Sequence, residues 1–177
     1  MNLDKVLDQA GSQRPTPVPV PDFTLTDQHG QFFRLSDQGG RVVVLFFGYT
    51  HCPEVCPTTI ADMSAVMGDL GDKAKDFRLF FITLDPARDT PQAMKDYVSN
   101  FDPRIEALVP TAEELPKLAK DFHIFYETIP SEDGNYTLNH TALVFLFNAK
   151  GGFNSTIAYD ETKANRLAKM QKLLAAQ

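Results

Sequence analysis

Several features are scarce in this sequence, and each scarcity narrows the class of protein. Tryptophan is absent, and cysteine occurs only twice among 177 residues, which excludes the disulfide framework of a small secreted scaffold. The longest strongly apolar run covers only residues 42–47, whereas a membrane-spanning helix needs about 20 apolar residues. No secretory signal pattern is present either. The chain is therefore expected to be cytosolic as made, or a soluble part separated from its targeting segment.

Basic residues are also in the minority. The chain has 17 Lys and Arg against 23 Asp and Glu, which gives a formal net charge of −6. A nucleic-acid-binding domain would show a basic face, and an anionic membrane surface would attract a Lys- and Arg-rich run, which this sequence lacks. The composition, 43% hydrophobic and 23% charged residues, is ordinary for one globular domain.

The first 20 residues differ from the rest. Prolines alternate at positions 15, 17, 19 and 21, a spacing that favours extended polyproline geometry. We expect residues 1–20 to be a flexible Pro-rich tail or linker and residues 21–177 to form the folded domain.

Hydrophobic periodicity in the remainder predicts alternating strands and helices. Strands are expected at 22–26, 31–35, 41–47, 77–84, 105–109, 125–129, 141–148 and 153–159, and helices at 57–70, 91–100, 111–122 and 161–176. This order predicts an α/β domain with a central sheet between helices. If strands 41–47 and 77–84 are parallel, the loops after them open at the same sheet edge, where such folds bind ligands.

The two cysteines lie in the first of these loops, in the segment Gly48–Pro57. A proline after each cysteine disfavours right-handed helical angles there, and Pro57 suits a first helical position. We therefore expect Cys56 at the helix N-cap and Cys52 in the loop before it. A helix N-terminus favours a thiolate, so the pair is expected to be reactive, metal-binding, or both, and not merely two buried small side chains.

Two thiolates are soft ligands that select Cu(I) or Zn(II), and His51, His123 and His140 are candidates for a third ligand. His140 comes just before the strand expected at 141–148. In thioredoxin-like folds, the corresponding loop carries a cis-proline that touches the active-site cysteines. This chain has no proline there, and His140 stands in about that place, so we expect its imidazole to point at the thiols. We interpret His51 as an exposed neighbour of Cys52, and His123 as a helix C-terminal cap or a half-buried histidine.

Other residues near the motif have simpler interpretations. Met63 and Met67 fall on the apolar stripe of their helix and are expected in the core. Asp89, beside Thr90 and Pro91, is expected to cap a helix. Asp85 ends a buried strand at the edge of the site, and it is a candidate for a hydrogen bond that orients one of the metal ligands.

Together these motifs resemble the Sco/SenC family, thioredoxin-like copper chaperones and redox proteins of respiratory oxidase assembly. The resemblance covers about residues 20–175 and rests on four segments: Asp22–Leu25 with Asp27 and Gly30; Phe46–Thr50 with Cys52-Pro53 and Cys56-Pro57; Asp85-Pro86 with Arg88–Pro91; and His140-Thr141. The family usually has Asp-His-Ser at the last motif, where this chain has Asn139, His140 and Thr141.

The resemblance implies a thioredoxin-like fold with an N-terminal β-hairpin extension, and one copper ion, Cu(I) or Cu(II), bound by Cys52, Cys56 and His140. It implies a metallochaperone for the CuA centre of cytochrome c oxidase, with the copper-bearing oxidase subunit, a thiol reductant and another copper donor as partners. Family members normally follow a signal or membrane anchor. We therefore expect the soluble domain of a longer precursor in the periplasm, or in the mitochondrial intermembrane space of a eukaryote.

Three other functions fit parts of this pattern. The chain could be a metal-free thiol–disulfide oxidoreductase reducing cysteines of the oxidase subunit, although it has three residues between its cysteines where thioredoxin-type enzymes have two. A peroxiredoxin-like peroxidase would need Thr and Pro at the positions of Pro53 and Tyr49. A zinc site of Cys₂His type would suit the ligands, but no general base is evident beside it.

Overall fold

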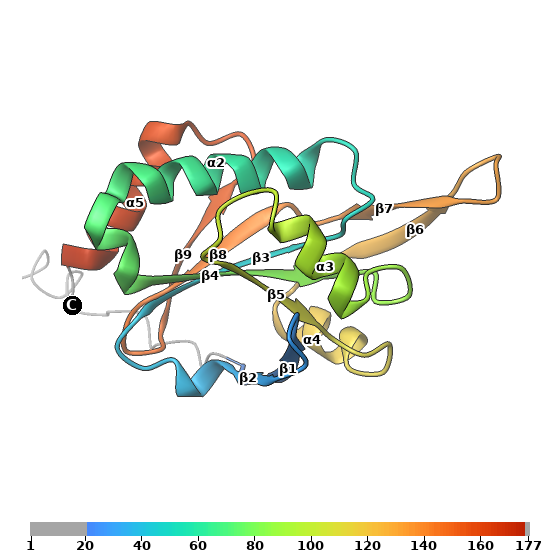
Figure 1. Ribbon diagram of the computed structural model, residues 1–177, viewed down its shortest axis with the longest axis horizontal. Coiled ribbons are helices and arrows are strands. Elements are labelled where there is room, and N and C mark those ends of the chain that lie inside the picture. The colour runs from blue at the N-terminus through green and yellow to red at the C-terminus, as the bar shows by residue number, and fades with distance from the viewer. Residues whose placement is uncertain (1–20, 176–177) are drawn as a thin grey trace, which may run out of the picture.

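The computed structural model describes residues 21–175, so the predicted Pro-rich tail lies outside the described part of the chain (Figure 1). None of the described helices is long and apolar enough to cross a membrane. The strands are β1 (Thr24–Asp27), β2 (Phe32–Arg34), β3 (Val42–Gly48), β4 (Phe77–Thr83), β5 (Ile105–Val109), β6 (Tyr126–Pro130), β7 (Tyr136–His140), β8 (Leu143–Phe147) and β9 (Phe153–Ala158). The α-helices are α2 (Val55–Leu70), α3 (Pro91–Val98), α4 (Leu115–Asp121) and α5 (Lys163–Ala175), with 3-10 turns at Leu35–Asp37 and Gly71–Asp76.

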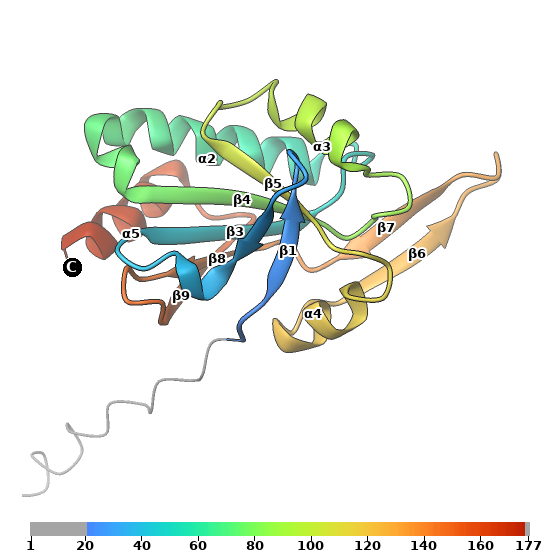
Figure 2. The same cartoon turned by 60° about the horizontal axis from the view of Figure 1, so that its bottom comes forward.

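Seven strands form one mixed sheet in the order β2-β1-β5-β4-β3-β8-β9. All seven residues of β3 are buried, as expected for a strand covered on both faces. β3 is parallel to β4 and antiparallel to β8. The helices α2 and α3 lie on one side of the sheet and α4 on the other (Figure 2). The predicted α/β class, with a mixed sheet between helices, is confirmed.

The N-terminal hairpin β1–β2 joins the same sheet, because β1 pairs antiparallel with β5. Phenylalanines fill the space between this hairpin, the sheet and α4. Phe122 at the end of α4 has its ring 5.5–6.2 Å from four others, those of Phe23, Phe47, Phe145 and Phe147. Met63 and Met67 are also buried, each 1% exposed, so their predicted core role is confirmed.

The helix after the cysteine loop starts earlier than predicted. It begins at Val55 with Glu54 as its N-cap residue, so Cys56 lies in the first turn and not at the N-cap. Pro57 fits this position because the first backbone N–H groups of a helix have no partner within it. The predicted helix end is confirmed, since Gly71 caps α2 with a φ of 57°.

The hairpin β6–β7 is a separate two-stranded sheet that projects away from the main sheet (Figure 1). The sequence predicts β6 and the turn at Asp133-Gly134, but it does not predict β7 and places His140 in a loop. His140 is instead the last residue of β7 and pairs with Tyr126. In this strand Leu138 is buried between exposed neighbours, the alternation expected of a half-buried strand. With only five residues, the strand is too short for this alternation to stand out in the sequence.

Candidate metal centre

The two cysteines are placed by a buried strand and the helix that follows it. Cys56 is fully buried and Cys52 is 9% exposed, and both thiols are free. The backbone N–H of Cys56 donates to Cys52 Sγ at 3.4 Å. Gly48, the last residue of β3, leaves room for this pair, because a Cβ atom there would lie 2.6 Å from Cys56 Sγ and 2.8 Å from the Phe81 ring.

The two thiols have opposite acidities. A hydrogen bond from Cys56 lowers the pKa of Cys52 to about 4 against the effect of burial, and the backbone N–H groups of Cys56 and Glu54 add to the lowering. The hydrogen bond to Cys52, and then burial and the Cys52 charge, raise the pKa of Cys56 far above its ordinary range. At neutral pH the pair therefore consists of a Cys52 thiolate and a Cys56 thiol.

His140 reaches the thiols from the end of β7. Its Nε2 lies 3.6 Å from Cys56 Sγ. Its Nδ1 lies 2.9 Å from the Thr141 carbonyl oxygen, and because a carbonyl can only accept, Nδ1 carries the proton and donates. With Nδ1 donating, the nitrogen left to bind a metal is Nε2, and it faces the sulfurs.

The sequence-predicted ligands are thus brought together, although Cys56 and His140 are 84 residues apart. The Sγ atoms of Cys52 and Cys56 and a ring nitrogen of His140 all lie within 4.8 Å of one another. One other group in the described part of the chain has comparable spacing, formed by His51, Asp85 and Asp89. The predicted strand adjacency that joins the two halves of the site is also confirmed, since β8, just after His140, pairs with β3.

Two tyrosines line the same region. Burial raises the pKa of Tyr49, whose ring meets the His140 ring edge-on at 5.8 Å. The Tyr49 hydroxyl accepts from the backbone N–H of Leu138 at 3.1 Å. Burial, and then the nearby Cys56 and Cys52, raise the pKa of Tyr97 on α3. Both phenols are therefore neutral at physiological pH.

Asp89 does not cap a helix, as the sequence suggested. Thr90 caps α3 itself, with its hydroxyl accepting from the Ala93 N–H. The fully buried Asp89 carboxylate instead accepts from the backbone N–H of Thr50 at 3.0 Å and the hydroxyl of Thr83 at 2.7 Å. It thereby ties the cysteine loop to the end of β4, because a buried carboxylate needs partners.

The histidines not chosen as ligands lie as predicted. His51 is half exposed, and its Nδ1 lies 3.8 Å from Asp89 Oδ1. His123 follows α4 with a φ of 55°. Its N–H donates to the Lys120 carbonyl, and the N–H of Ile124 donates to the Ala119 carbonyl, which together form a Schellman C-cap.

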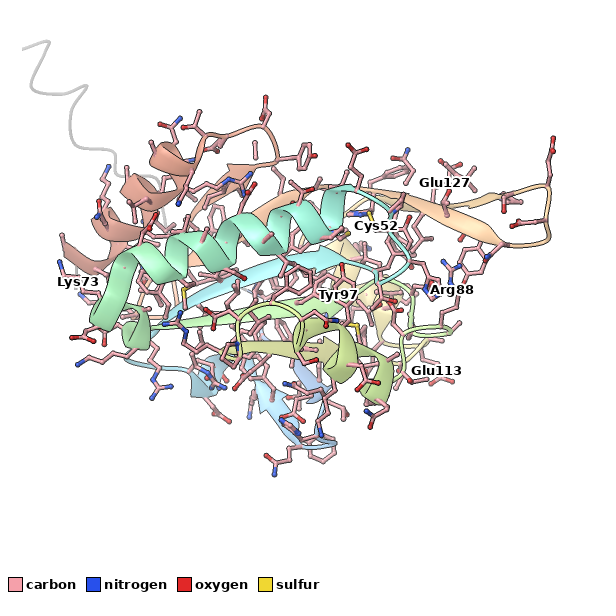
Figure 3. The ribbon with its side chains drawn as sticks, turned by 45° about the horizontal axis from the view of Figure 1, so that its top comes forward. Cys52, Lys73, Arg88, Tyr97, Glu113 and Glu127 are labelled. Carbon is pink, nitrogen blue, oxygen red and sulfur yellow. The ribbon has the colours of Figure 1, made fainter. Side chains whose placement is uncertain are left out.

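Asp85 is buried but faces the hairpin. One carboxylate oxygen accepts from Arg88 Nε and the other from the Tyr136 hydroxyl at 2.7 Å. Arg88 lies beside the hairpin in Figure 3. The sequence motifs contain Arg88 and Tyr49 but indicate no role for them, and Tyr136 belongs to none of the motifs. Their partners come from strand β7, which the sequence does not predict.

Comparison with known proteins agrees with the geometry. The SCO1/SenC family model matches residues 11–175. The SCO2-like protein of Rickettsia conorii is 34% identical over 134 residues, covering 75% of this chain and 65% of the relative. The human mitochondrial SCO1 homologue is 34% identical over 134 residues, covering 74% of this chain and 44% of that protein. The chain thus spans less than two thirds of the length of these relatives.

Solved structures show the same likeness. Bradyrhizobium japonicum ScoI with copper bound has a TM-score of 0.81 and 36% identity, covering 88% of this chain and 99% of that structure. The family model spans the whole described region, and the resemblance predicted from the motifs is confirmed. The chain belongs to the SCO1/SenC family.

Proposed function

We propose that this protein is a copper metallochaperone that holds one copper ion through Cys52, Cys56 and His140. The observation that carries the proposal is the convergence of two thiols and one imidazole lone pair within 4.8 Å, from segments far apart in the sequence. Two sulfurs and one nitrogen suit Cu(I) in a three-coordinate site, and Cu(II) with a further ligand. The copper-bound ScoI structure of Bradyrhizobium japonicum supports copper as the ion.

The protonation of the thiols fits the loading of such a site. Metal binding requires deprotonated cysteines. Cys52 is already a thiolate at neutral pH, whereas Cys56 holds its proton. Binding of one Cu(I) ion is therefore accompanied by release of one proton, from Cys56.

Within this proposal the cargo goes to the CuA centre of cytochrome c oxidase, as the family resemblance implies. The copper-bearing oxidase subunit, a copper donor and a thiol reductant are the proposed partners. The mitochondrial location of the human relative supports an extracytoplasmic location, in which the cysteines need a reductant to stay available for copper.

A metal-free thiol–disulfide oxidoreductase is the second candidate, and the thiol pair favours it. A stable Cys52 thiolate beside a protonated Cys56 is an arrangement that thiol exchange uses. In that reaction Cys52 Sγ would attack a disulfide of the oxidase subunit and release one of its thiols. Cys56 would then lose its proton, displace the second sulfur of the target and close the Cys52–Cys56 disulfide. The target would gain two electrons from the thiol pair, one proton from Cys56 and one proton from water.

Anaerobic Cu(I) titration of the reduced protein tests both candidates, with Zn(II) in parallel. We expect one copper per chain after desalting, about one proton released per copper, and no copper on protein whose two cysteines are oxidised. Retention of no copper by reduced protein would refute the chaperone proposal. If that protein still reduced an oxidase-derived disulfide peptide, the second candidate would stand. Preferential retention of zinc would instead indicate a zinc site.

A further inference from the structure

His140 belongs to the hairpin β6–β7, which has few stabilising contacts of its own. The hairpin β6–β7 pairs with no other strand in the described region, and an isolated two-stranded hairpin is marginally stable in water. Its exposed face carries Ile129, and its turn carries Glu132 and Asp133, all open to solvent. The position of His140 over the sulfurs therefore depends on what fastens the hairpin to the rest of the domain.

Arg88 makes the most extensive of these attachments. Its Nη1 donates to Asn135 Oδ1 at 2.9 Å and to the Tyr136 carbonyl at 3.0 Å. Its guanidinium carbon lies 3.6 Å from the centre of the Tyr136 ring. On the other side, its Nε donates to Asp85, and Asp85 also accepts from the Tyr136 hydroxyl. The Arg88 side chain is only 17% exposed, so water screens these contacts weakly.

These contacts hold β7 at Tyr136, its first residue, and His140 is the last residue of the same strand. Tyr136, Leu138 and His140 alternate along β7 and share one face of the hairpin, because side chains repeat with period two. Arg88 holds the backbone at Tyr136, and the Tyr49 hydroxyl holds it at Leu138. His140 follows two residues later, so both attachments fix the direction in which β7 delivers its imidazole.

We propose that Arg88 is the positioning residue for His140 in copper binding, clamping β7 to the Asp85 loop so that Nε2 meets the sulfurs. The inference rests on the proposed function. Arg88 has no hydrogen bond or ion pair with either cysteine. Its loss therefore weakens the nitrogen ligand and leaves the thiol pair as it is.

The shape of the guanidinium is what this role needs. Arg88 stacks on an aromatic ring while donating from two nitrogens in different directions, which a lysine ammonium cannot reproduce. Arg88→Lys keeps the positive charge opposite Asp85. It loses the planar group that stacks on the Tyr136 ring and the two nitrogens that donate in different directions. It is therefore expected to behave like Arg88→Gln and not like the wild type.

The test compares Arg88→Gln, Arg88→Lys and Tyr136→Phe with the wild type. Arg104→Gln is the matched control, because Arg104 pairs with Asp102 on the surface away from the hairpin. We measure Cu(I) affinity by competition with a chromophoric chelator, the dithiol midpoint potential, and the sulfur-to-Cu(II) absorption band. Copper affinity is expected to fall about 10–100-fold in the Arg88 variants and less in Tyr136→Phe. The absorption band of the Cu(II) form should shift in the Arg88 variants, while their dithiol midpoint potential should equal that of the wild type. Arg104→Gln should match the wild type in all three measurements.

A double-mutant cycle with His140→Ala separates positioning from general structure. Because Arg88 acts through His140, Arg88→Gln should cost no further copper affinity once His140 is gone. An additional loss there would refute the inference, as would unchanged copper affinity in folded Arg88 variants or a parallel shift of the midpoint potential. If the Arg88 variants do not fold, Tyr136→Phe and Asn135→Ala decide, since both retain the Arg88–Asp85 pair. A wild type that binds no copper refutes the proposed function instead.

Discussion

The site joins two regions built in opposite ways, the cysteine loop between β3 and α2 and the projecting hairpin β6–β7. The first region is part of the core: β3 is buried throughout, Cys56 is inaccessible, and Gly48 leaves no spare room beside it. The second is mostly exposed, with all residues of β6 from Glu127 onward open to solvent. Both sulfurs come from the rigid region and the imidazole from the projecting one.

This difference indicates how such a site could accept and release an ion. In the proposed chaperone, core packing around Cys56 and Gly48 would hold the two sulfurs of the reduced protein in place for copper. The imidazole is fixed by a few contacts at the edge of a short ribbon, so its removal requires breaking hydrogen bonds and not repacking the core. The regions should therefore respond differently to substitution.

Removal of the imidazole is expected to have the largest effect on copper. In His140→Ala, Cu(I) affinity should fall by more than about 100-fold, beyond the loss typical of residues behind a ligand. The fold should persist, because His140 ends an exposed hairpin and packs little. Competition titration and thermal melting of reduced protein measure both quantities. His29→Ala serves as the control, since His29 lies in an exposed turn. An unchanged copper affinity with a lowered melting temperature would show that His140 is structural.

Crowding the rigid region is expected to affect both stability and copper. A methyl group in Gly48→Ala would overlap Cys56 Sγ and the Phe81 ring, which stacks on Phe46 at 5.7 Å. Overpacking of this kind typically lowers the free energy of unfolding by about 1–3 kcal/mol, and displacement of the sulfur should weaken copper binding. Denaturant unfolding and copper titration provide the measurements.

Gly68→Ala is the matched control for Gly48→Ala. Gly68 lies in α2, the helix that carries Cys56, and a Cβ atom there meets nothing within 4 Å. Alanine is the better helix former by up to about 1 kcal/mol, so this variant should be slightly more stable and bind copper normally. Equal behaviour of the two variants would contradict the packing argument.

The same division explains what the sequence could predict. Long apolar runs such as 42–47 and 77–84 identify buried strands without help from the rest of the fold, and parallel pairing then places the cysteine loop. β7 was missed because its five residues alternate only around Leu138, and its stability comes from partners elsewhere, including Tyr49 and Arg88. The ligand set was predicted through family motifs. The contacts of Asp89 and Arg88 with distant residues have no signature in local spacing.

The pH dependence of folding stability should distinguish Cys52 from Cys56 in the reduced protein. Folding lowers the pKa of Cys52 from 9.0 to about 4, so the unfolded chain binds the extra proton between these pH values. Through Cys52, stability therefore rises with pH over this window and is lost on acidification. Folding raises the pKa of Cys56, so above pH 9 the folded chain retains a proton that the unfolded chain releases, and stability falls.

Denaturant unfolding from pH 4 to pH 10 measures this dependence, with Cys52→Ser as the comparison. The serine variant removes the thiolate, so the rise in stability between about pH 4 and pH 9 should be smaller than in the wild type. Identical pH profiles for the two proteins would show that Cys52 is not the titrating group.

The smallest effect is expected at His51, which adjoins Cys52 but belongs to neither ligand region. Its ring is half exposed, and its nearest acidic neighbour is Asp89 at 3.8 Å. Asp89 and Asp85 already accept hydrogen bonds from Thr50, Thr83, Arg88 and Tyr136, so a metal bound by these three residues would have to displace those donors. We therefore expect His51→Ala to bind one copper per chain with unchanged affinity, measured by metal analysis after desalting. A second tightly held ion in the wild type, lost in His51→Ala, would show that this group is a site of its own. A large fall in affinity would instead make His51 a ligand, and the imidazole would no longer have to come from the hairpin.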